Sequence, residues 1–198
     1  MKFVLATQNP KKLKEMNEIL SHLGVEVVSE AELGVRIEVE ETGETFTDNA
    51  RLKATAVMQA TGLPAVADDS GLCVDALNGG PGVYSARFGG EGLDDKGRYT
   101  LLLEMLRGQT DRAAHFHTSI VCVFPNGDEL VCEGECPGTI AFAPMGEGGF
   151  GYDPVFFVPE LRKTFGQLTA EEKASVSHRG KALRAFAAAL DDYLKGNE

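Results

Sequence analysis

The alternation of apolar and polar residues changes period within the first thirty residues of the chain. Residues 2–6 form a compact apolar run, typical of a buried strand, which ends in Thr7-Gln8-Asn9-Pro10. Asn9 is a favourable N-cap and Pro10 suits the first helical position, so a helix is predicted to begin here. Apolar residues then recur at helical spacing as far as Gly24, where we expect the helix to end. These residues are Leu13, Met16, Ile19, Leu20 and Leu23.

The following segment continues the same strand–helix alternation, which is how an α/β sheet begins. The second predicted helix presents small and apolar residues inward, namely Ala50, Ala54, Val57 and Met58, and Gly62-Leu63-Pro64 terminates it. In chain order we expect a strand at 25–28, an acidic connector at 37–44, a helix capped by Thr47 or Asp48 and ending near Thr61, a strand at 63–67, and a strand at 72–77.

The second half of the chain is richer in strands and turns. Pro125-Asn126-Gly127-Asp128 is a strong turn signal between two strand-like runs, and Thr169-Ala170-Glu171-Glu172 is a capping box. In order we expect a loop at 78–82, then a helix that is capped by Asp94 or Asp95 and ends near Gly108. A strand at 112–124 follows, and its partner at 129–135 is extended by 139–142. The chain then continues with a glycine-rich loop at 145–154 and a helix that reaches about Leu194, with a break near Ser177. The pattern therefore predicts one α/β domain over residues 1–198, with two lobes around a cleft.

Composition narrows the classes of function. The chain has 198 residues, 43% of them hydrophobic, and a net charge of −11, which argues against a protein that binds nucleic acid or anionic membranes through a basic face. No apolar run is as long as a membrane span, and the N-terminal run is too short for a signal peptide, so we expect a cytosolic protein. A small polyanion held by a few local cations and a metal is still compatible with this charge.

The four cysteines do not form a CxxC pair. Cys73 and Cys122 lie in apolar runs where buried reduced thiols are common. A zinc site built from Cys132, Cys136, His115 and His117 is conceivable, but the spacing matches no familiar template.

Two adjacent carboxylates, Asp68 and Asp69, follow the apolar run at 63–67 and precede Ser70 and Gly71. Neighbouring carboxylates repel each other and resist burial, whereas their hard oxygens suit Mg²⁺. The alternative is a solvated turn with Gly71 at positive φ.

Two further stretches in the first half could serve the same site. The residues from Thr7 to Lys12 place a tight loop and a helix N-terminus after a strand, and such an arrangement can bind anions. The alternative is a capped helix that binds no anion, which would have the same sequence pattern. Glu40 and Glu41 in the acidic connector could add carboxylates for the metal, although such runs are usually solvated loops.

Two stretches in the second half could bind a nucleotide. Phe150 or Tyr152, within a glycine-rich loop, could stack on a base, and Asp153 could accept hydrogen bonds from it. Lys173 could reach a phosphate, and His178-Arg179 offers donors to carbonyl oxygens of a base. The alternatives are aromatic residues tucked into the core and a surface helix cap.

The order of these motifs closely resembles the inosine/xanthosine triphosphate pyrophosphatase family over essentially the whole chain. Gln8 departs from the family, which usually has Gly there, and this puts the loop geometry near the phosphates in doubt. The motifs are Thr7-Gln8-Asn9-x-x-Lys12, Glu40-Glu41-Thr42-Gly43, Ala67-Asp68-Asp69-Ser70-Gly71, Gly79-Gly80-Pro81-Gly82-x-Tyr84-Ser85-Ala86-Arg87, Gly149-Phe150-Gly151-Tyr152-Asp153-Pro154 and Ser177-His178-Arg179.

The resemblance implies a Mg²⁺-dependent hydrolase that cuts dITP, ITP and XTP to the monophosphate and pyrophosphate and so cleans the nucleotide pool. It implies an elongated mixed sheet flanked by helices, an active-site cleft between two lobes, and a homodimer. It assigns the general base to Asp69 and the metal to Glu40 and Asp69, with Asp68 and Glu41 as further candidates. The implied substrate contacts are Thr7, Gln8, Asn9, Pro10, Lys11, Lys12, Lys53, Ser70, Phe150, Gly151, Tyr152, Asp153, Lys173, His178 and Arg179.

Two other functions stay open at this point. One is a pyrophosphatase for modified pyrimidine or methylated nucleotides on a related fold. The other is a nucleotide-binding module without turnover, which the carboxylates Glu40 and Asp69 argue against, because binding alone needs no base.

Overall fold

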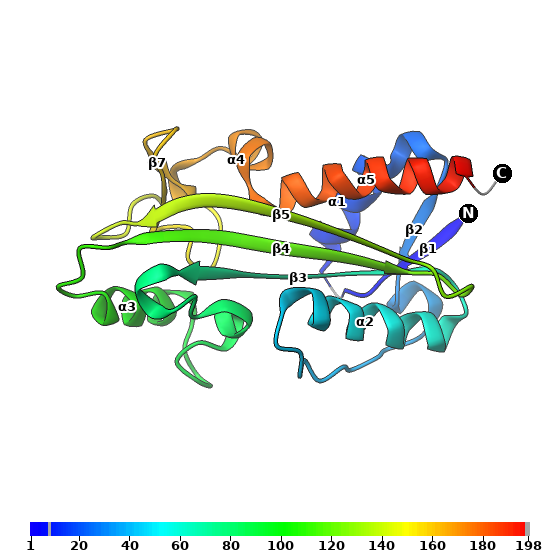
Figure 1. Cartoon of the computed structure of the whole chain (residues 1–198), viewed down its shortest axis with the longest axis horizontal. Coiled ribbons are helices and arrows are strands. Elements are labelled where there is room, and N and C mark those ends of the chain that lie inside the picture. Colours follow the sequence, from blue (N-terminus) through cyan, green and yellow to red (C-terminus); the bar gives the residue numbers. More distant parts are fainter. Residues whose placement is uncertain (8, 197–198) are drawn as a thin grey trace. The chain divides into compact units, whose positions relative to one another are not determined.

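The computed structural model describes residues 1–7 and 9–196. Within them, seven strands form one mixed sheet in the order β2-β1-β3-β4-β5-β6-β7, flanked by helices (Figure 1). The predicted α/β class is therefore confirmed. The strands are β1 (Lys2–Leu5), β2 (Glu26–Ser29), β3 (Ala65–Val74), β4 (Ala113–Val123), β5 (Glu129–Ile140), β6 (Phe156–Val158) and β7 (Lys163–Thr164), and the α-helices are α1 (Pro10–Leu20), α2 (Phe46–Thr61), α3 (Asp95–Met105), α4 (Ala170–Val176) and α5 (His178–Gly196).

The chain divides into two compact units, which we describe separately. Among the described residues, the first comprises 1–7, 9–69, 118–134 and 181–196, and the second comprises 70–117 and 135–180. Strands β3, β4 and β5 contribute residues to both units.

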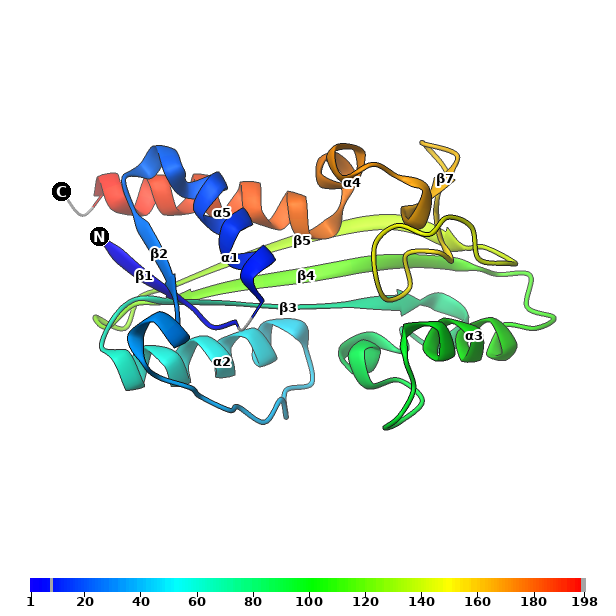
Figure 2. The ribbon, with the colours of Figure 1, turned by 180° about the vertical axis from the view of Figure 1, so that it is seen from behind.

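In the first unit, alternate residues of each strand pack against helices on opposite faces of the sheet. Phe3 and Leu5 of β1 join the apolar side chains of α1 and α5 in one cluster, whereas Val4 packs with Val57 of α2. Figures 1 and 2 show α1 and α5 on one face and α2 on the other. Strands β2 and β3 run parallel to β1 on either side of it, as expected for strands joined through helices.

The second unit has a core rich in aromatic rings. Phe116 of β4 lies against Phe156 of β6, with ring centroids 4.6 Å apart, and stacks on Phe165 at 5.6 Å. Leu102 and Leu106 from α3 and the residue after it complete this core. Strands β6 and β7 pair antiparallel beyond β5. They were not predicted, because both are very short and lie in a segment with no alternating pattern.

Several local predictions are confirmed and others are wrong. Asn9 caps α1, with its side chain accepting from Lys11 N, and Thr169 caps α4 in a capping box. Helix α2 begins two or three residues earlier than predicted, because its N-cap is Thr45 and not Thr47 or Asp48. The Thr45 side chain accepts the hydrogen bond from Asp48 N. The break near Ser177 is confirmed by the junction of α4 and α5. No helix in residues 1–7 and 9–196 combines the length and apolar character that crossing a membrane requires.

Candidate active site

The adjacent carboxylates Asp68 and Asp69 lie inside β3 and not in a turn after it. The prediction of a strand end at Ala67 is therefore wrong for β3. The parallel pairing of β1 with β3, however, ends at Leu5 and Val66. Asp68 and Asp69 thus project beyond the carboxyl end of β1, where ligands of parallel sheets bind.

Lys12 of α1 compensates for the burial of Asp68. The Asp68 residue is only 4% exposed, and Lys12 Nζ donates to its Oδ2 at 2.8 Å. A buried carboxylate without such a partner would be strongly unfavourable, so the first turn of α1 is fastened to β3. Lys12 and Asp68, which were predicted for different roles in the site, are thus in direct contact.

Lys53 of α2 joins the acidic connector to β3. Its ammonium donates to Glu41 Oε1 at 2.7 Å and to the carbonyl of Asp68 at 2.9 Å, and lies 3.7 Å from Asp69 Oδ1. Glu40, the preferred metal candidate from the sequence, is exposed, whereas Glu41 is half-buried. Glu41 is therefore the connector carboxylate that contacts Lys53, which in turn lies beside Asp69.

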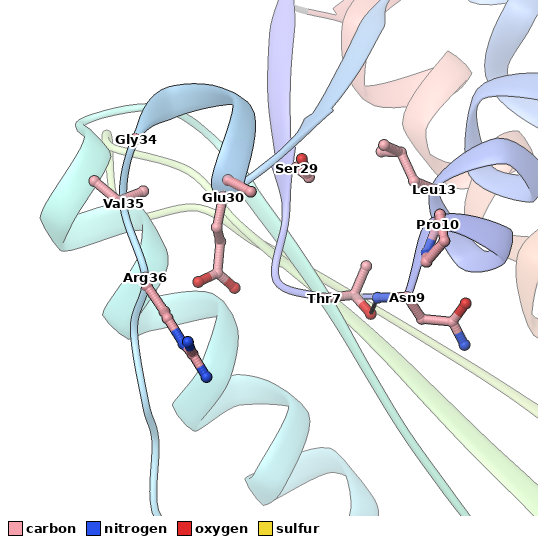
Figure 3. Close-up of a pocket in the computed structure, with 10 residues that line it drawn as sticks. Thr7, Asn9, Pro10, Leu13, Ser29, Glu30, Gly34, Val35 and Arg36 are labelled. Atoms are coloured by element: carbon pink, nitrogen blue, oxygen red, sulfur yellow. Dashed lines mark hydrogen bonds between the residues drawn. The ribbon is translucent and has the colours of Figure 1, made fainter.

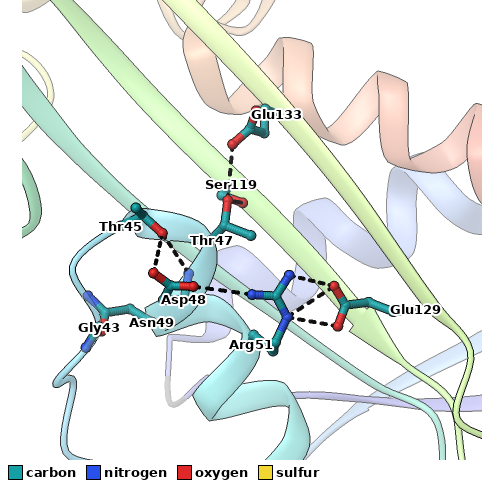
Figure 4. A network of polar contacts seen from close by, with 9 residues as sticks. All are labelled: Gly43, Thr45, Thr47, Asp48, Asn49, Arg51, Ser119, Glu129 and Glu133. Carbon is teal, nitrogen blue, oxygen red and sulfur yellow. Dashed lines mark hydrogen bonds and ion pairs between the residues drawn. The ribbon is translucent and has the colours of Figure 1, made fainter.

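Asn49 is a residue of this site that the sequence interpretation missed. It is fully buried on α2, donates from Nδ2 to Asp69 Oδ2 at 3.2 Å, and accepts from Gly43 N on Oδ1 at 2.8 Å. The sequence does contain an indication of this role, because Asn49 lies one helical turn before Lys53 and so shares its side of the helix. The inward face of this helix was predicted from its apolar residues alone, and Asn49 was therefore not included. Figure 4 shows Gly43 and Asn49 beside the polar contacts that begin α2.

The network in Figure 4 holds α2 against the β4–β5 hairpin. Arg51 makes a bidentate contact with Glu129, with Nη2 to Oε1 at 2.7 Å and Nε to Oε2 at 2.9 Å. Thr47 Oγ1 lies 2.8 Å from Ser119 Oγ and donates to Glu133 Oε1 at 3.0 Å. Two successive turns of the helix are therefore fixed to the sheet, and Asn49 lies between them.

The predicted phosphate loop lies at the start of α1. Asn9 N donates to Thr7 Oγ1 at 3.2 Å, and Asn9 Oδ1 caps the helix, with Pro10 and the exposed Lys11 in its first turn. Gln8 lies outside the described residues. Beside this loop is a pocket of about 400 Å³, with Thr7 and Asn9 on one side and Glu30 and Arg36 on the other (Figure 3).

In the second unit, Asp153 and Lys173 form a buried ion pair. Asp153 is 3% exposed, and its Oδ2 accepts from Lys173 Nζ and, at 2.8 Å, from Phe150 N. Burial raises the pKa of Asp153, and the charge and hydrogen bond of Lys173 oppose that shift without cancelling it. The pair fixes the loop that precedes β6.

Of the two aromatic residues predicted to stack on a base, Phe150 is the exposed one. Its side chain is 77% exposed, and its ring centroid lies 4.8 Å from Lys173 Nζ. Tyr152 is buried, donates its hydroxyl to Ser85 O at 2.8 Å, and has its pKa raised to about 12 by burial. Gly151 N donates to Asp95 Oδ2 at 2.7 Å, so Phe150 is presented from a loop whose two following residues are anchored.

His178 and Arg179 open α5 and are half-buried in the second unit. The His178 ring stacks on Phe116 at 4.7 Å between centroids. Phe165 lies near both His178, at 6.4 Å, and Lys173 Nζ, at 5.3 Å, so these predicted residues share one aromatic surface. Ser70 is half-buried on β3.

The donors in the first unit suit a magnesium ion better than zinc. Among residues 1–7 and 9–196, no three His, Cys, Asp or Glu side chains form a group that could hold a metal, and this includes the zinc alternative at Cys132, Cys136, His115 and His117. Mg²⁺ commonly uses one or two carboxylates together with water and substrate phosphates. Glu41 and Asp69, which both contact the ammonium of Lys53, offer hard oxygen donors of this kind.

Comparison with known proteins gives a consistent result over the whole chain. The model of the Ham1 family matches residues 3–189. A protein of an Exiguobacterium species named dITP/XTP pyrophosphatase is 49% identical over 196 residues, covering 99% of this chain and 100% of that protein. Among solved structures, a HAM1 protein from Coxiella burnetii aligns with a TM-score of 0.93 and 43% identity, covering 97% of this chain and 99% of the other. A nucleoside-triphosphatase or dITP/XTP pyrophosphatase from Mycobacterium abscessus aligns with a TM-score of 0.82 and 48% identity, covering 96% and 99%.

Proposed function

Because the chain belongs to the Ham1 family, we propose that it hydrolyses deaminated purine nucleoside triphosphates, namely dITP, ITP and XTP, to the monophosphate and pyrophosphate. The biological consequence is that deaminated purines are removed from the nucleotide pool before they enter DNA or RNA. The observation that carries the proposal is the arrangement of Glu41, Lys53 and Asp69 beyond the end of β1, next to the pair of Lys12 and Asp68.

This arrangement supplies the parts that phosphoanhydride hydrolysis needs. The start of α1 offers backbone N–H groups and a favourable dipole to phosphate oxygens, and Lys12 and Lys53 add positive charge. Glu40 and Asp69 were predicted to hold Mg²⁺, with Asp68 and Glu41 as further candidates. Among these four, we propose that Asp69 and Glu41 would hold the ion, because both lie beside the same residue, Lys53. Bound there, Mg²⁺ would polarise the α-phosphate and lower the pKa of a water.

In the proposed reaction, Asp69 accepts a proton from a water molecule as the water oxygen bonds to the α-phosphorus. The bond from the α-phosphorus to the bridging oxygen breaks, and pyrophosphate leaves. Lys12 and Lys53 stabilise charge on the phosphate oxygens as the leaving group departs.

The proposed base contacts come from the second unit. Phe150 offers a flat ring for stacking, Asp153 and Lys173 fix the loop that carries it, and His178 and Arg179 supply donors. Hypoxanthine and xanthine carry a carbonyl at the 6-position, whereas adenine carries an amino group that would face a donor. A site built on such a hydrogen bond rejects the mismatched base by roughly 10⁴-fold.

A panel of triphosphates tests the proposal. Pyrophosphate release is measured with dITP, ITP, XTP, dATP, dGTP, and methylated and modified pyrimidine triphosphates. We expect rapid release from the deaminated purines and loss of at least roughly 100-fold in Asp69→Asn. Asp192→Asn, at an exposed position of α5, is the control and should retain activity.

Each alternative has its own result in this panel. A preference for modified pyrimidine or methylated nucleotides would show that the protein is the related pyrophosphatase. Tight binding without pyrophosphate release would show that it is a nucleotide-binding module without turnover. Near-normal turnover by Asp69→Asn would remove Asp69 from the role of base. We also propose a homodimer in the cytoplasm, where the nucleotide pool is, and light scattering of the purified protein tests the dimer.

A further inference from the structure

Asn49 places a neutral amide between the acidic connector and β3. The residue is fully buried, and a buried amide is unfavourable unless its donors and its acceptor find partners. Its Oδ1 accepts from Gly43 N at 2.8 Å, and its Nδ2 donates to Asp69 Oδ2 at 3.2 Å. The two partners also fix the orientation of the amide, because only the nitrogen can donate to a carboxylate and only the oxygen can accept from an N–H.

The connector approaches Asn49 so closely that only glycine fits at position 43. A Cβ on Gly43 would lie 2.7 Å from Asn49 Oδ1 and 2.9 Å from Asn49 N. The connector is thus in direct contact with the first turn of α2 two residues after Glu41, which pairs with Lys53 at 2.7 Å. Any movement of Asn49 would shift both the connector and the contact with Asp69.

A charged group lies beside the other oxygen of Asp69. Lys53 Nζ lies 3.7 Å from Oδ1, whereas Asn49 contacts Oδ2, and Glu41 reaches Asp69 through the same lysine. Asp68, the preceding residue of β3, is turned toward Lys12. Asn49 thus makes the hydrogen bond to Oδ2, whereas Lys53 offers its charge to Oδ1 without a hydrogen bond. The hydrogen bond restricts the plane of the carboxylate, and proton transfer from a positioned water requires such a defined orientation.

We propose that Asn49 is a positioning residue for the reaction, which bridges Gly43 of the acidic connector to Asp69 of β3 and holds the Asp69 carboxylate in its productive orientation. The inference rests on the proposed function, in which Asp69 is the general base. Asn49 acts through Asp69 and does not itself contact the reacting atoms.

Two substitutions separate this role from simple anchoring of the connector. Asn49→Ala removes both contacts, whereas Asn49→Asp keeps an acceptor for Gly43 N and loses the donor toward Asp69. If Asn49 positions Asp69, kcat for pyrophosphate release falls about 10- to 100-fold in both variants, with a much smaller change in KM. Amide exchange at Gly43, measured by NMR, is expected to accelerate in Asn49→Ala and to stay slow in Asn49→Asp.

Asn17 provides the matched control in the same unit. Its side chain also bridges two segments, donating to Val27 O at 2.8 Å and accepting from Val27 N at 3.1 Å, away from the connector. Asn17→Ala is expected to lose stability in urea to a similar degree as Asn49→Ala while keeping kcat within roughly threefold of the original protein.

The outcomes distinguish this inference from the proposed function. A value of kcat for Asn49→Asp within roughly threefold of the original protein, with Asp69→Asn inactive, would overturn the positioning role and leave the proposed function intact. Loss of kcat in Asn17→Ala equal to that in Asn49→Ala would also overturn it, because general destabilisation would then account for both. Absence of pyrophosphate release from the unsubstituted protein would instead reject the proposed function.

Discussion

A single buried carboxylate in the second unit has an unusual titration. Asp153 is 3% exposed, and burial raises its pKa above the ordinary value of 3.8, although Lys173 opposes the shift. The folded protein therefore holds the proton of Asp153 at a pH where the unfolded chain has released it. The contribution of this group to stability is fully present below the unfolded pKa and is lost as pH rises through the folded pKa.

Asp153→Asn removes this titration and leaves a neutral side chain of the same shape. We expect the free energy of unfolding of the original protein, relative to Asp153→Asn, to decrease as pH rises from about 3.8. Urea unfolding of both proteins from about pH 3.5 to about pH 6 measures this difference. A difference that grows with pH would mean that the ion pair with Lys173, and not burial, governs Asp153.

Helix α2 is the element on which the first part of the site depends. It carries Asn49 and Lys53, and its N-cap Thr45 lies two residues after Gly43, so the beginning of the helix and the end of the connector are one structural feature. Thr45 Oγ1 accepts from Asp48 N at 3.1 Å and donates to Asp48 Oδ2 at 2.7 Å.

Thr45→Ala should destabilise the protein, because an N-H of the first turn loses its acceptor. We expect a cost of about 1 kcal/mol in the free energy of unfolding, measured by urea denaturation. Thr45→Ser retains the hydroxyl and is expected to stay close to the original stability. Equal losses in the two variants would show that the methyl group, and not the cap, stabilises the start of α2.

The sequence predicted elements best where local chemistry decides the structure. The Asn9-Pro10 start of α1 and the capping box at Thr169 need only neighbouring residues, and both are confirmed. The sequence predicted a strand end at Ala67, whereas β3 continues through Asp68 and Asp69, because the length of β3 depends on pairing with strands far away in sequence. The contact of Asn49 with Asp69 could not be predicted for the same reason, because Asp69 lies on a strand whose position relative to α2 is set by the tertiary fold.

At the scale of the whole molecule, the net charge of the protein disfavours binding of the proposed substrate. The chain carries a net charge of −11, and a triphosphate is itself a polyanion, so long-range attraction cannot bring the two together. The structure offers only local cations, and in the first unit Lys12 and Lys53 are already paired with Asp68 and Glu41. Additional positive charge must therefore accompany the substrate.

Removal of divalent cations tests this argument directly. With excess EDTA, we expect pyrophosphate release from dITP to fall at least roughly 100-fold and to return when Mg²⁺ is added in excess of the chelator. Circular dichroism in EDTA should be unchanged, because the contacts of Lys12 and Lys53 hold the carboxylates in place without a metal. Undiminished release in EDTA would mean that the lysines alone neutralise the triphosphate, and the assignment of Glu41 and Asp69 to a metal would be wrong. A loss of folded structure in EDTA would instead indicate that a metal stabilises the fold.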